Sequence, residues 1–407
     1  MSIRAPRGFA LRSLLAYLGL LATILELCYL LRMSSEPAPL DVNPQLECAE
    51  TLASRFYTDP AILSLEKERI FLRTWQLAGT LSQPCGESNG RKHTIADPET
   101  YFTSDIAGEP VVVVRDKTGI LRAFSNVCRH RAGPIAQGSG CRSVLNCAYH
   151  GWTYSLDGRL IGTPEVDGVE LFDRSAMGMV PVRCETWQQF VFVNFDRGAL
   201  PLADYLGNIP QLSRAFPFDG LSLAERHDYY VDCNWKVYVD NYLEGYHIPI
   251  VHPGLMKEID YPRYRCETFR YHSQQIGPVK ELKPNNHDER VYPPGSVLPE
   301  ALYFWVFPNL MLNIYPDNIQ VNVVVPLAHD KTLTIFEWYF HKADSEKFRE
   351  RAAKAIAFSD TVQAEDMHIC EAVQRGLRST TYDRGRYSVK RENGVHHFHM
   401  LLAEFLT

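Results

Sequence analysis

The feature that most constrains the fold of this chain is a pair of short boxes, Cys128-Arg-His130 and Cys147-Ala-Tyr-His150. Each box puts a thiol and an imidazole on one tight stretch of chain. The residues between the boxes are rich in glycine and include a proline, which are turn formers that let two loops fold back toward one point. The pattern therefore predicts two loops that bring thiolates and imidazoles to a shared metal centre.

Two kinds of metal centre use two cysteines and two histidines. Zinc is the first candidate, but zinc fingers usually pair cysteine with cysteine and histidine with histidine, whereas here each box contributes one of each. The mixed boxes favour a [2Fe–2S] cluster in which thiolates hold one iron and imidazoles the other, the Rieske type of ligation. We therefore expect Cys128, His130, Cys147 and His150 to bind the cluster, and we interpret Cys141 as a small apolar filler.

On these residues the sequence resembles the Rieske non-haem iron oxygenases, which are the large or alpha subunits of ring-hydroxylating and related oxygenases. The matching stretches are Cys128–Arg131 and Cys147–Tyr154, with Gly158 closing the following turn. The resemblance covers most of residues 45–407. It implies one domain for the cluster and a second, catalytic domain for a mononuclear iron.

Composition limits the partners. The chain has 407 residues, enough for two or more domains, each with its own core. Its net charge is −6 and it has no long basic block, so nothing indicates nucleic acid; small molecules and redox proteins are the expected partners. Its ten cysteines follow no regular disulfide spacing, which fits a reducing compartment, and we expect a cytoplasmic protein.

Residues 13–31 form a mostly apolar stretch that follows several arginines. The stretch is long enough for a membrane anchor, although Glu26 would cost something like 2.5–3.5 kcal/mol near the bilayer centre. Alternatively, Met33 is a natural start and residues 1–32 are upstream sequence. A cleaved secretory signal fits less well, because no clear A-x-A cleavage site follows. The sequence leaves anchor and upstream sequence equally open.

The chain divides into four segments. Residues 1–44 hold the apolar stretch and a Pro-rich linker, and residues 45–75 have the periodicity of a leading helix. Residues 76–186 alternate short strand patterns with turns, which predicts a small all-β Rieske domain. Residues 187–407 combine more strand patterns with a long helix at about 344–377. The fold class is therefore α+β, with a larger catalytic domain of antiparallel sheet and helices that the resemblance implies to be helix-grip-like.

A second metal site is predicted around His247 and His252. They are five residues apart, so one unbroken helix would turn them away from each other. Pro249 is expected to end the helix near His247, which lets His252 approach from the following loop.

The third ligand is expected from the late helix, which offers Glu365, Asp366 and His368. Asp366 is favoured because it shares a stripe with apolar residues that include Ile369 and Val373 and so faces the core, where a carboxylate needs a partner. Two imidazoles and one carboxylate with open positions form the facial triad of non-haem Fe(II) oxygenases.

The resemblance assigns roles to these residues. His247, His252 and Asp366 stand where the iron ligands of the family are expected. Glu244 stands where an acid links a cluster histidine of one subunit to an iron histidine of its neighbour, which implies a ring, expected to be a homotrimer. Many relatives carry Asp at this position, so Glu244 is a departure with a longer reach.

The implied reaction takes electrons from NAD(P)H through a separate reductase or ferredoxin and uses O₂ to hydroxylate a small organic substrate. The spacing around Glu244 and the late helix look most like the choline, carnitine and glycine-betaine branch. Aromatic-ring or sterol oxygenation are the alternatives, and an electron-transfer protein without a second iron site is a third. Aromatic residues near the predicted iron site can form either a box for a trimethylammonium group or simple core: Tyr230, Tyr238, Tyr242, Tyr246, Tyr303, Phe304, Trp305, Phe307 and Tyr315.

Overall fold

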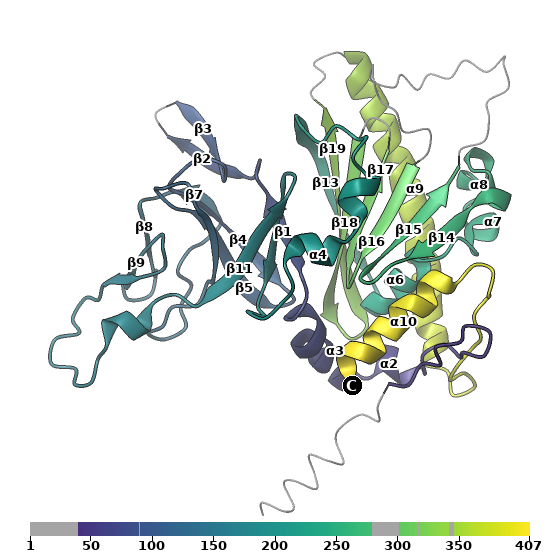
Figure 1. Cartoon of the computed structure of the whole chain (residues 1–407), viewed down its shortest axis with the longest axis horizontal. Coiled ribbons are helices and arrows are strands. Elements are labelled where there is room, and N and C mark those ends of the chain that lie inside the picture. The colour runs from purple at the N-terminus through teal and green to yellow at the C-terminus, as the bar shows by residue number, and fades with distance from the viewer. Residues whose placement is uncertain (1–39, 89, 279–300, 316–317, 342–345) are drawn as a thin grey trace, which may run out of the picture. The chain divides into compact units, whose positions relative to one another are not determined.

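The computed structural model describes residues 40–88, 90–278, 301–315, 318–341 and 346–407. Residues 41–407 form one compact unit, shown in Figure 1. The apolar stretch 13–31 lies outside the described residues, so both of its interpretations stay untested. In the described ranges, no helix combines the length and the apolar character needed to cross a membrane.

The cluster boxes belong to an all-β region, as predicted. Its main sheet is antiparallel and seven-stranded, in the order β1-β12-β11-β6-β5-β4-β7, and it is accompanied by a three-stranded sheet, β10-β9-β8, and a hairpin, β2-β3. The strands of the main sheet are β1 Gln76–Thr80, β4 Thr100–Ile106, β5 Glu109–Arg115, β6 Leu121–Ser125, β7 Ser139–Cys141, β11 Pro181–Trp187 and β12 Phe190–Asn194. The others are β2 Pro84–Ser88, β3 Arg91–Thr94, β8 Val144–Asn146, β9 Thr153–Ser155 and β10 Leu160–Gly162, and a 3₁₀ turn spans Arg174–Met177.

The expected domain boundary at residue 187 is too early. β12 pairs with both β1 and β11, so Phe190–Asn194 completes the first sheet instead of opening the catalytic domain. β11 and β12 are joined by a tight turn, and such consecutive strands pair with each other. We therefore propose that the catalytic domain begins after Asn194.

The single helix expected over residues 45–75 is also wrong. The structure instead has α2 Arg55–Thr58, α3 Pro60–Glu66 and a π-helical turn at Lys67–Phe71. Asp59 and Pro60 explain the break. Proline lacks the amide that would continue α2 but is well placed in the first turn of α3, and the Asp59 side chain accepts the amide of Ala61 at 2.8 Å as an N-cap.

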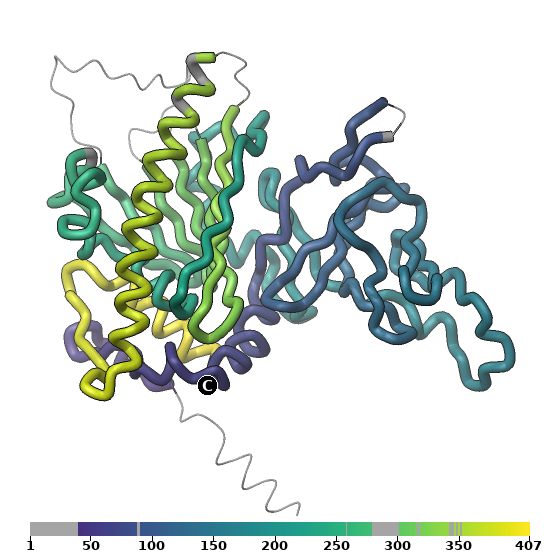
Figure 2. The backbone as a smooth tube through the Cα atoms, turned by 180° about the vertical axis from the view of Figure 1, so that it is seen from behind, coloured from purple at the N-terminus to yellow at the C-terminus, as the bar shows by residue number. Residues whose placement is uncertain are grey.

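The second sheet is antiparallel and seven-stranded, in the order β13-β19-β18-β17-β16-β15-β14. Its strands are β13 Leu221–Val231, β14 Arg265–Thr268, β15 His272–Gly277, β16 Ala301–Val306, β17 Leu310–Ile314, β18 Asn318–Ala328 and β19 Lys331–His341. The helices are α4 Leu202–Leu206, α5 Ile209–Leu212, α6 Trp235–Tyr242, α7 Ile248–Val251, α8 Leu255–Glu258, α9 Glu346–Leu377 and α10 Asn393–Leu406, with a 3₁₀ turn at Tyr261–Arg263. Figure 2 shows the long helix α9 lying along one face of this sheet. Strands and helices together give the predicted α+β class.

One face of the second sheet is apolar. Phe304, Leu312 and Val321 lie directly opposite one another on β16, β17 and β18, and all three are buried. They belong to a core that also contains Trp187 and Phe190 of the first sheet. This core joins the two sheets.

The opposite face of the same strands is polar. Gln275, Tyr303, Asn313 and Gln320 form one cross-strand row on β15 to β18, and the three amides are buried. Tyr242 of α6 donates to Asn313 Oδ1 at 2.6 Å, and a serine of α9 donates to Gln320 at 3.3 Å. Since residues that lie opposite one another share a face, this amide row faces α6 and α9.

Candidate metal centres

The two cluster boxes lie in two loops of the same construction. After β6, the amide of Cys128 donates to the carbonyl of Gly133 at 2.8 Å. The carbonyl of Cys128 accepts the amide of Ala132 at 3.0 Å. Between β8 and β9, the amide of Cys147 donates in the same way (2.8 Å), and its carbonyl accepts the amide of Gly151 (3.0 Å). Ala132 and Gly151 occupy equivalent positions and both have positive φ, 55° and 70°. Each cysteine thus begins a tight turn that presents the histidine after it.

Gly133 lets the two loops approach each other. A Cβ atom at this position would lie 3.0 Å from Cys147 Sγ and 3.1 Å from Tyr149 Cβ, both in the second loop. A side chain here would therefore have to push the second loop away by a few tenths of an ångström. Glycine allows the close approach of the loops without this shift.

The four predicted cluster residues have complementary environments. The thiols of Cys128 and Cys147 are buried, and none of the nine cysteines within the described residues forms a disulfide. The imidazoles of His130 and His150 are exposed, and their ring centroids lie 4.6 Å apart. Two thiols on the protein side and two imidazoles on the solvent side fit a Rieske-type [2Fe–2S] cluster, which would be held at the tip of the loops.

The second group of ligands is built by a break between two helices. α6 ends at Tyr242, His247 precedes the short helix α7, and His252 follows it. The prediction that Pro249 ends the helix near His247 is wrong, because α6 already ends at Tyr242 and Pro249 lies in the first turn of α7, where a proline is favourable. Both histidines thus flank one helical turn and can face the same point.

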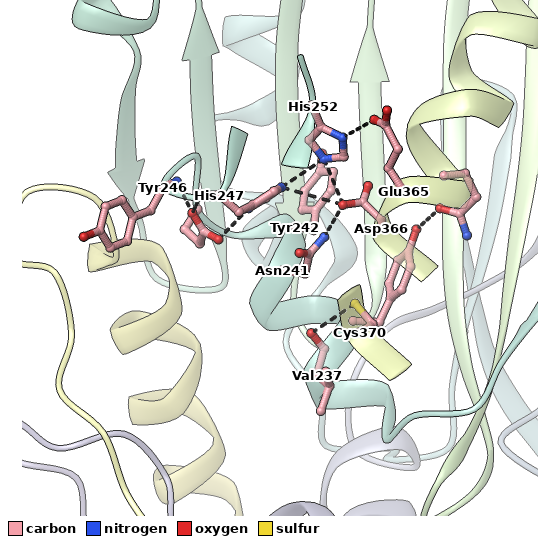
Figure 3. Close-up of polar contacts among 12 residues, drawn as sticks. Val237, Asn241, Tyr242, Tyr246, His247, His252, Glu365, Asp366 and Cys370 are labelled. Carbon is pink, nitrogen blue, oxygen red and sulfur yellow. Dashed lines mark hydrogen bonds and ion pairs between the residues drawn. The ribbon is translucent and has the colours of Figure 1, made fainter. Parts of the chain in front are cut away.

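His247, His252 and Asp366 are brought together in the structure, and one ligand atom from each lies within 4.8 Å of the others. The Nε2 atoms of the two imidazoles are 3.1 Å apart, and Asp366 Oδ1 lies 2.9 Å from His252 Nε2 and 3.6 Å from His247 Nε2 (Figure 3). His252 is buried and the other two are partly buried. The apolar stripe that favoured Asp366 is less complete than predicted, because Val373 is 44% exposed.

A carboxylate holds the far nitrogen of each imidazole. Glu244 Oε1 lies 2.5 Å from His247 Nδ1, and Glu365 Oε2 lies 2.6 Å from His252 Nδ1. In the tautomer whose Nδ1–H donates to these carboxylates, the lone pair lies on Nε2, and both Nε2 atoms lie near Asp366.

The converging atoms are all electron-pair donors. Asn241 Nδ2 donates to Asp366 Oδ1 at 2.7 Å and holds this carboxylate toward the imidazoles. Burial alone would lower the pKa of His252, but the hydrogen bonds and charges of Asp366 and Glu365 raise it above its ordinary value. The site therefore attracts a cation. Two imidazoles and one carboxylate suit Fe(II) with open coordination positions.

Sequence reasoning found the three converging residues and Glu244 as a partner of an iron histidine, but it did not find the partner of His252. Glu365 was considered only as a competing ligand, and His368, the other candidate, is exposed. Only the position of Glu365 next to Asp366 in the sequence indicated that it could also reach the imidazole of His252.

Two family descriptions match the chain. Residues 90–173 match "Rieske [2Fe-2S] domain", and residues 218–407 match "Ring hydroxylating alpha subunit (catalytic domain)". The first match contains both cluster boxes, and the second contains the three converging ligands. Together they cover most of the described chain.

Full-length relatives are also similar. Choline monooxygenase, chloroplastic, of Arabidopsis thaliana is 37% identical over 377 residues, which is 89% of this chain and 84% of the relative. The carnitine monooxygenase oxygenase subunit of Escherichia coli (strain K12) is 32% identical over 380 residues, which is 90% of this chain and 96% of the relative. The solved structure of the quaternary ammonium Rieske monooxygenase CntA in complex with substrate L-carnitine has a TM-score of 0.76 and 31% identity, and covers 91% of this chain and 100% of its own.

Proposed function

Because this chain belongs to the Rieske ring-hydroxylating oxygenase alpha subunits, and is thus an oxidoreductase that carries a [2Fe–2S] cluster and a mononuclear iron, we propose that it hydroxylates a small quaternary ammonium compound such as choline or carnitine. The expectation of an oxygenase is confirmed over that of a bare electron-transfer protein, since the catalytic domain matches along with the Rieske domain. The relatives named for choline and carnitine support this substrate class.

The observation that carries the substrate proposal is a group of tyrosines beside the candidate iron site. Tyr242, Tyr264, Tyr303 and Tyr315 are each partly accessible, yet burial raises the pKa of each phenol, and neighbouring tyrosines raise those of Tyr242 and Tyr315 further. The rings of Tyr303 and Tyr315 meet edge to face, with centroids 5.8 Å apart. Tyrosine faces attract a trimethylammonium cation, so we propose that these partly accessible rings receive the cationic group of the substrate.

The other aromatic residues that were considered from the sequence have different places. Phe304, Trp305 and Phe307 are completely buried and belong to the core, whereas Tyr230 and Tyr246 are exposed. Tyr264 was missed by the sequence reasoning. It comes from the segment before β14 and reaches Gln275 of the amide row through its hydroxyl.

The amide row supplies polar groups beside these tyrosines. Asn313 accepts the hydroxyl of Tyr242, and Gln275 donates to the carbonyl of the same residue at 2.6 Å. Tyr242 follows Asn241, which holds Asp366. Tyrosine faces for the cation and amides for hydroxyl or carbonyl oxygens would thus orient the substrate beside the iron ligands.

We assign the metal ligands by the same reasoning. Cys128, Cys147, His130 and His150 would hold the cluster, and His247, His252 and Asp366 would hold the iron. The cluster would pass single electrons, received from a separate NAD(P)H-dependent reductase or ferredoxin, to the iron, where O₂ is activated. The chain's own contribution is to support His247 through Glu244 and to keep His252 away from water.

Exposed side chains at both centres support a ring of copies, which we propose to be a homotrimer. Tyr149, next to the cluster residue His150, is 55% exposed. Tyr246 and Ile250, on either side of His247, are 58% and 85% exposed. Large apolar side chains exposed at functional sites mark contact surfaces, and a head-to-tail arrangement would cover both of them.

Substrate-dependent O₂ uptake tests the proposal. The full chain, loaded with both metal centres and supplied with a reductase, is expected to consume O₂ with choline, carnitine or glycine betaine and to release a hydroxylated product. Asp366→Ala should abolish uptake and lose the mononuclear iron, while the absorbance of the cluster remains. Uptake with aromatic acids or sterols and none with quaternary ammonium compounds would reject the substrate class.

A further inference from the structure

Consecutive residues of α9 hold one imidazole from both sides. Glu365 Oε2 lies 2.6 Å from His252 Nδ1, and Asp366 Oδ1 lies 2.9 Å from His252 Nε2 (Figure 3). The side chain of His252 is 2% exposed, whereas that of Glu365 is 31% exposed. The buried ring of His252 is thus held by Asp366 on the side of the converging ligands and by the partly exposed Glu365 on the other side.

The contact at Nδ1 decides which nitrogen is free for a metal. A neutral imidazole carries one proton. With Asp366 bound to the metal, Glu365 would be the carboxylate left to accept that proton, which places it on Nδ1 and leaves the lone pair on Nε2. Without that acceptor, the Nδ1–H would lose its charged and fixed partner, and the preference for this tautomer and ring orientation would weaken. Glu365 therefore acts on His252 without touching the metal itself.

We propose that Glu365 is a positioning residue that locks His252 in its iron-binding tautomer and orientation. The inference rests on the proposed function, since it takes His252 as an iron ligand. Glu244 makes the equivalent contact to His247, but it also accepts the backbone amide of His247 at 3.1 Å, so its effect on the loop cannot be separated from its effect on the imidazole. Glu365 is the cleaner case.

The surroundings of Glu365 make this role testable by chemical rescue. Glu365 lines an open hollow of about 750 Å³, together with residues of α9 and Val251 of α7. Truncating Glu365 would therefore connect His252 Nδ1 to solvent through the hollow. A small carboxylate such as formate could then take the place of the missing side chain.

The experiment measures how readily Fe(II) leaves the full chain for the chelator ferrozine under anaerobic conditions, with the cluster absorbance as an internal check. Glu365→Ala is expected to weaken iron retention on the order of 10- to 100-fold, the usual effect of removing the partner of a ligating histidine. Formate should restore much of this loss. Glu365→Gln should lie between the two, because its amide oxygen can still accept the Nδ1–H.

Glu371→Ala is the matched control. Glu371 is on the same helix and accepts the amide of Asp232 at 3.3 Å, but it makes no contact with the three converging residues. This variant should retain iron like the unmodified chain and show no response to formate. The inference is overturned if Glu365→Ala keeps its iron, or if it loses iron that formate does not restore. Failure of the proposed function would look different, because His252→Ala would then hold as much iron as the unmodified chain.

Discussion

Tyr154 shows how one residue can tune the cluster loops without binding a metal. Its hydroxyl lies 3.3 Å from Cys128 Sγ and accepts the amide of Arg129 at 3.1 Å. The residue is completely buried, and burial raises the pKa of its phenol, so it stays protonated and can donate to a thiolate. A hydrogen bond to a cluster sulfur stabilises the reduced state, which carries more negative charge.

Tyr154→Phe should therefore lower the reduction potential of the cluster. The loss of one hydrogen bond to a charged sulfur is worth roughly 1 kcal/mol or more, which corresponds to about 40 mV or more for a one-electron couple. Spectroelectrochemical titration of the loaded protein measures the shift. Tyr149→Phe is the control, because Tyr149 is exposed and should leave the potential unchanged. An unaltered potential in Tyr154→Phe would show that the hydroxyl does not donate to the sulfur.

At the residue scale, the sequence predicted the side chains that commonly bind metals, namely the thiols and imidazoles of the two cluster boxes. Cys128, His130 and their counterparts stand out because thiols and imidazoles at short spacing have few other uses. Tyr154 ends one matching stretch and Glu365 was a candidate ligand, but their roles were not predicted, since a tyrosine in a strand and a glutamate on a helix are ordinary there. Their roles depend on which distant segment lies against them, and local spacing does not contain that information.

Among the elements, α6 is the one whose placement matters most for the iron site, and a buried ion pair anchors its first turn. Lys236 Nζ lies 2.5 Å from Glu66 Oε1, and Trp235 Nε1 donates to Glu66 Oε2 at 2.7 Å. Both charged side chains are 1% exposed or less. The pair joins α3 to the start of α6. Near the other end of α6, Asn241 donates to Asp366 of α9.

Removing one partner of this pair should be worse than removing both. Lys236→Met leaves the Glu66 carboxylate buried without its cation and should destabilise the protein by about 3–5 kcal/mol, whereas Glu66→Leu combined with Lys236→Met should recover much of that loss. Urea unfolding measures both variants, and iron content shows whether the shift of α6 reaches the metal site. Equal destabilisation by the single and double changes would mean that packing, and not the unpaired charge, dominates.

Element boundaries were predicted well where periodicity is long and poorly where proline intervenes. The helix expected at about 344–377 is observed as Glu346–Leu377, because many turns of periodic pattern average out local irregularity. Pro60 and Pro249 were both misinterpreted. Each lies in the first turn of a helix after a break, whereas one helix was expected to run past Pro60 and Pro249 was expected only to end a helix.

At the scale of the whole molecule, the open question is how electrons reach the iron, and Glu244 is the residue at issue. Its Oε1 lies 2.5 Å from His247 Nδ1, and its Oε2 accepts the backbone amides of Tyr246 and His247. Within one chain the carboxylate therefore supports His247. In the proposed ring it would also have to reach an exposed cluster histidine, His130 or His150, of a neighbouring copy.

Glu244→Ala separates these two roles. If Glu244 links the centres, both should stay loaded and the cluster should still be reduced, while single-turnover electron transfer to the iron collapses, because the hydrogen-bonded connection between the two imidazoles is broken. Rapid-mixing spectroscopy of the pre-reduced protein, followed by iron analysis, measures both quantities. Glu244→Gln is the informative companion, since it keeps an acceptor for His247 Nδ1–H and should retain the iron under either interpretation. Loss of iron in Glu244→Ala, with normal transfer in the sites that remain loaded, would leave Glu244 as a support for His247 alone.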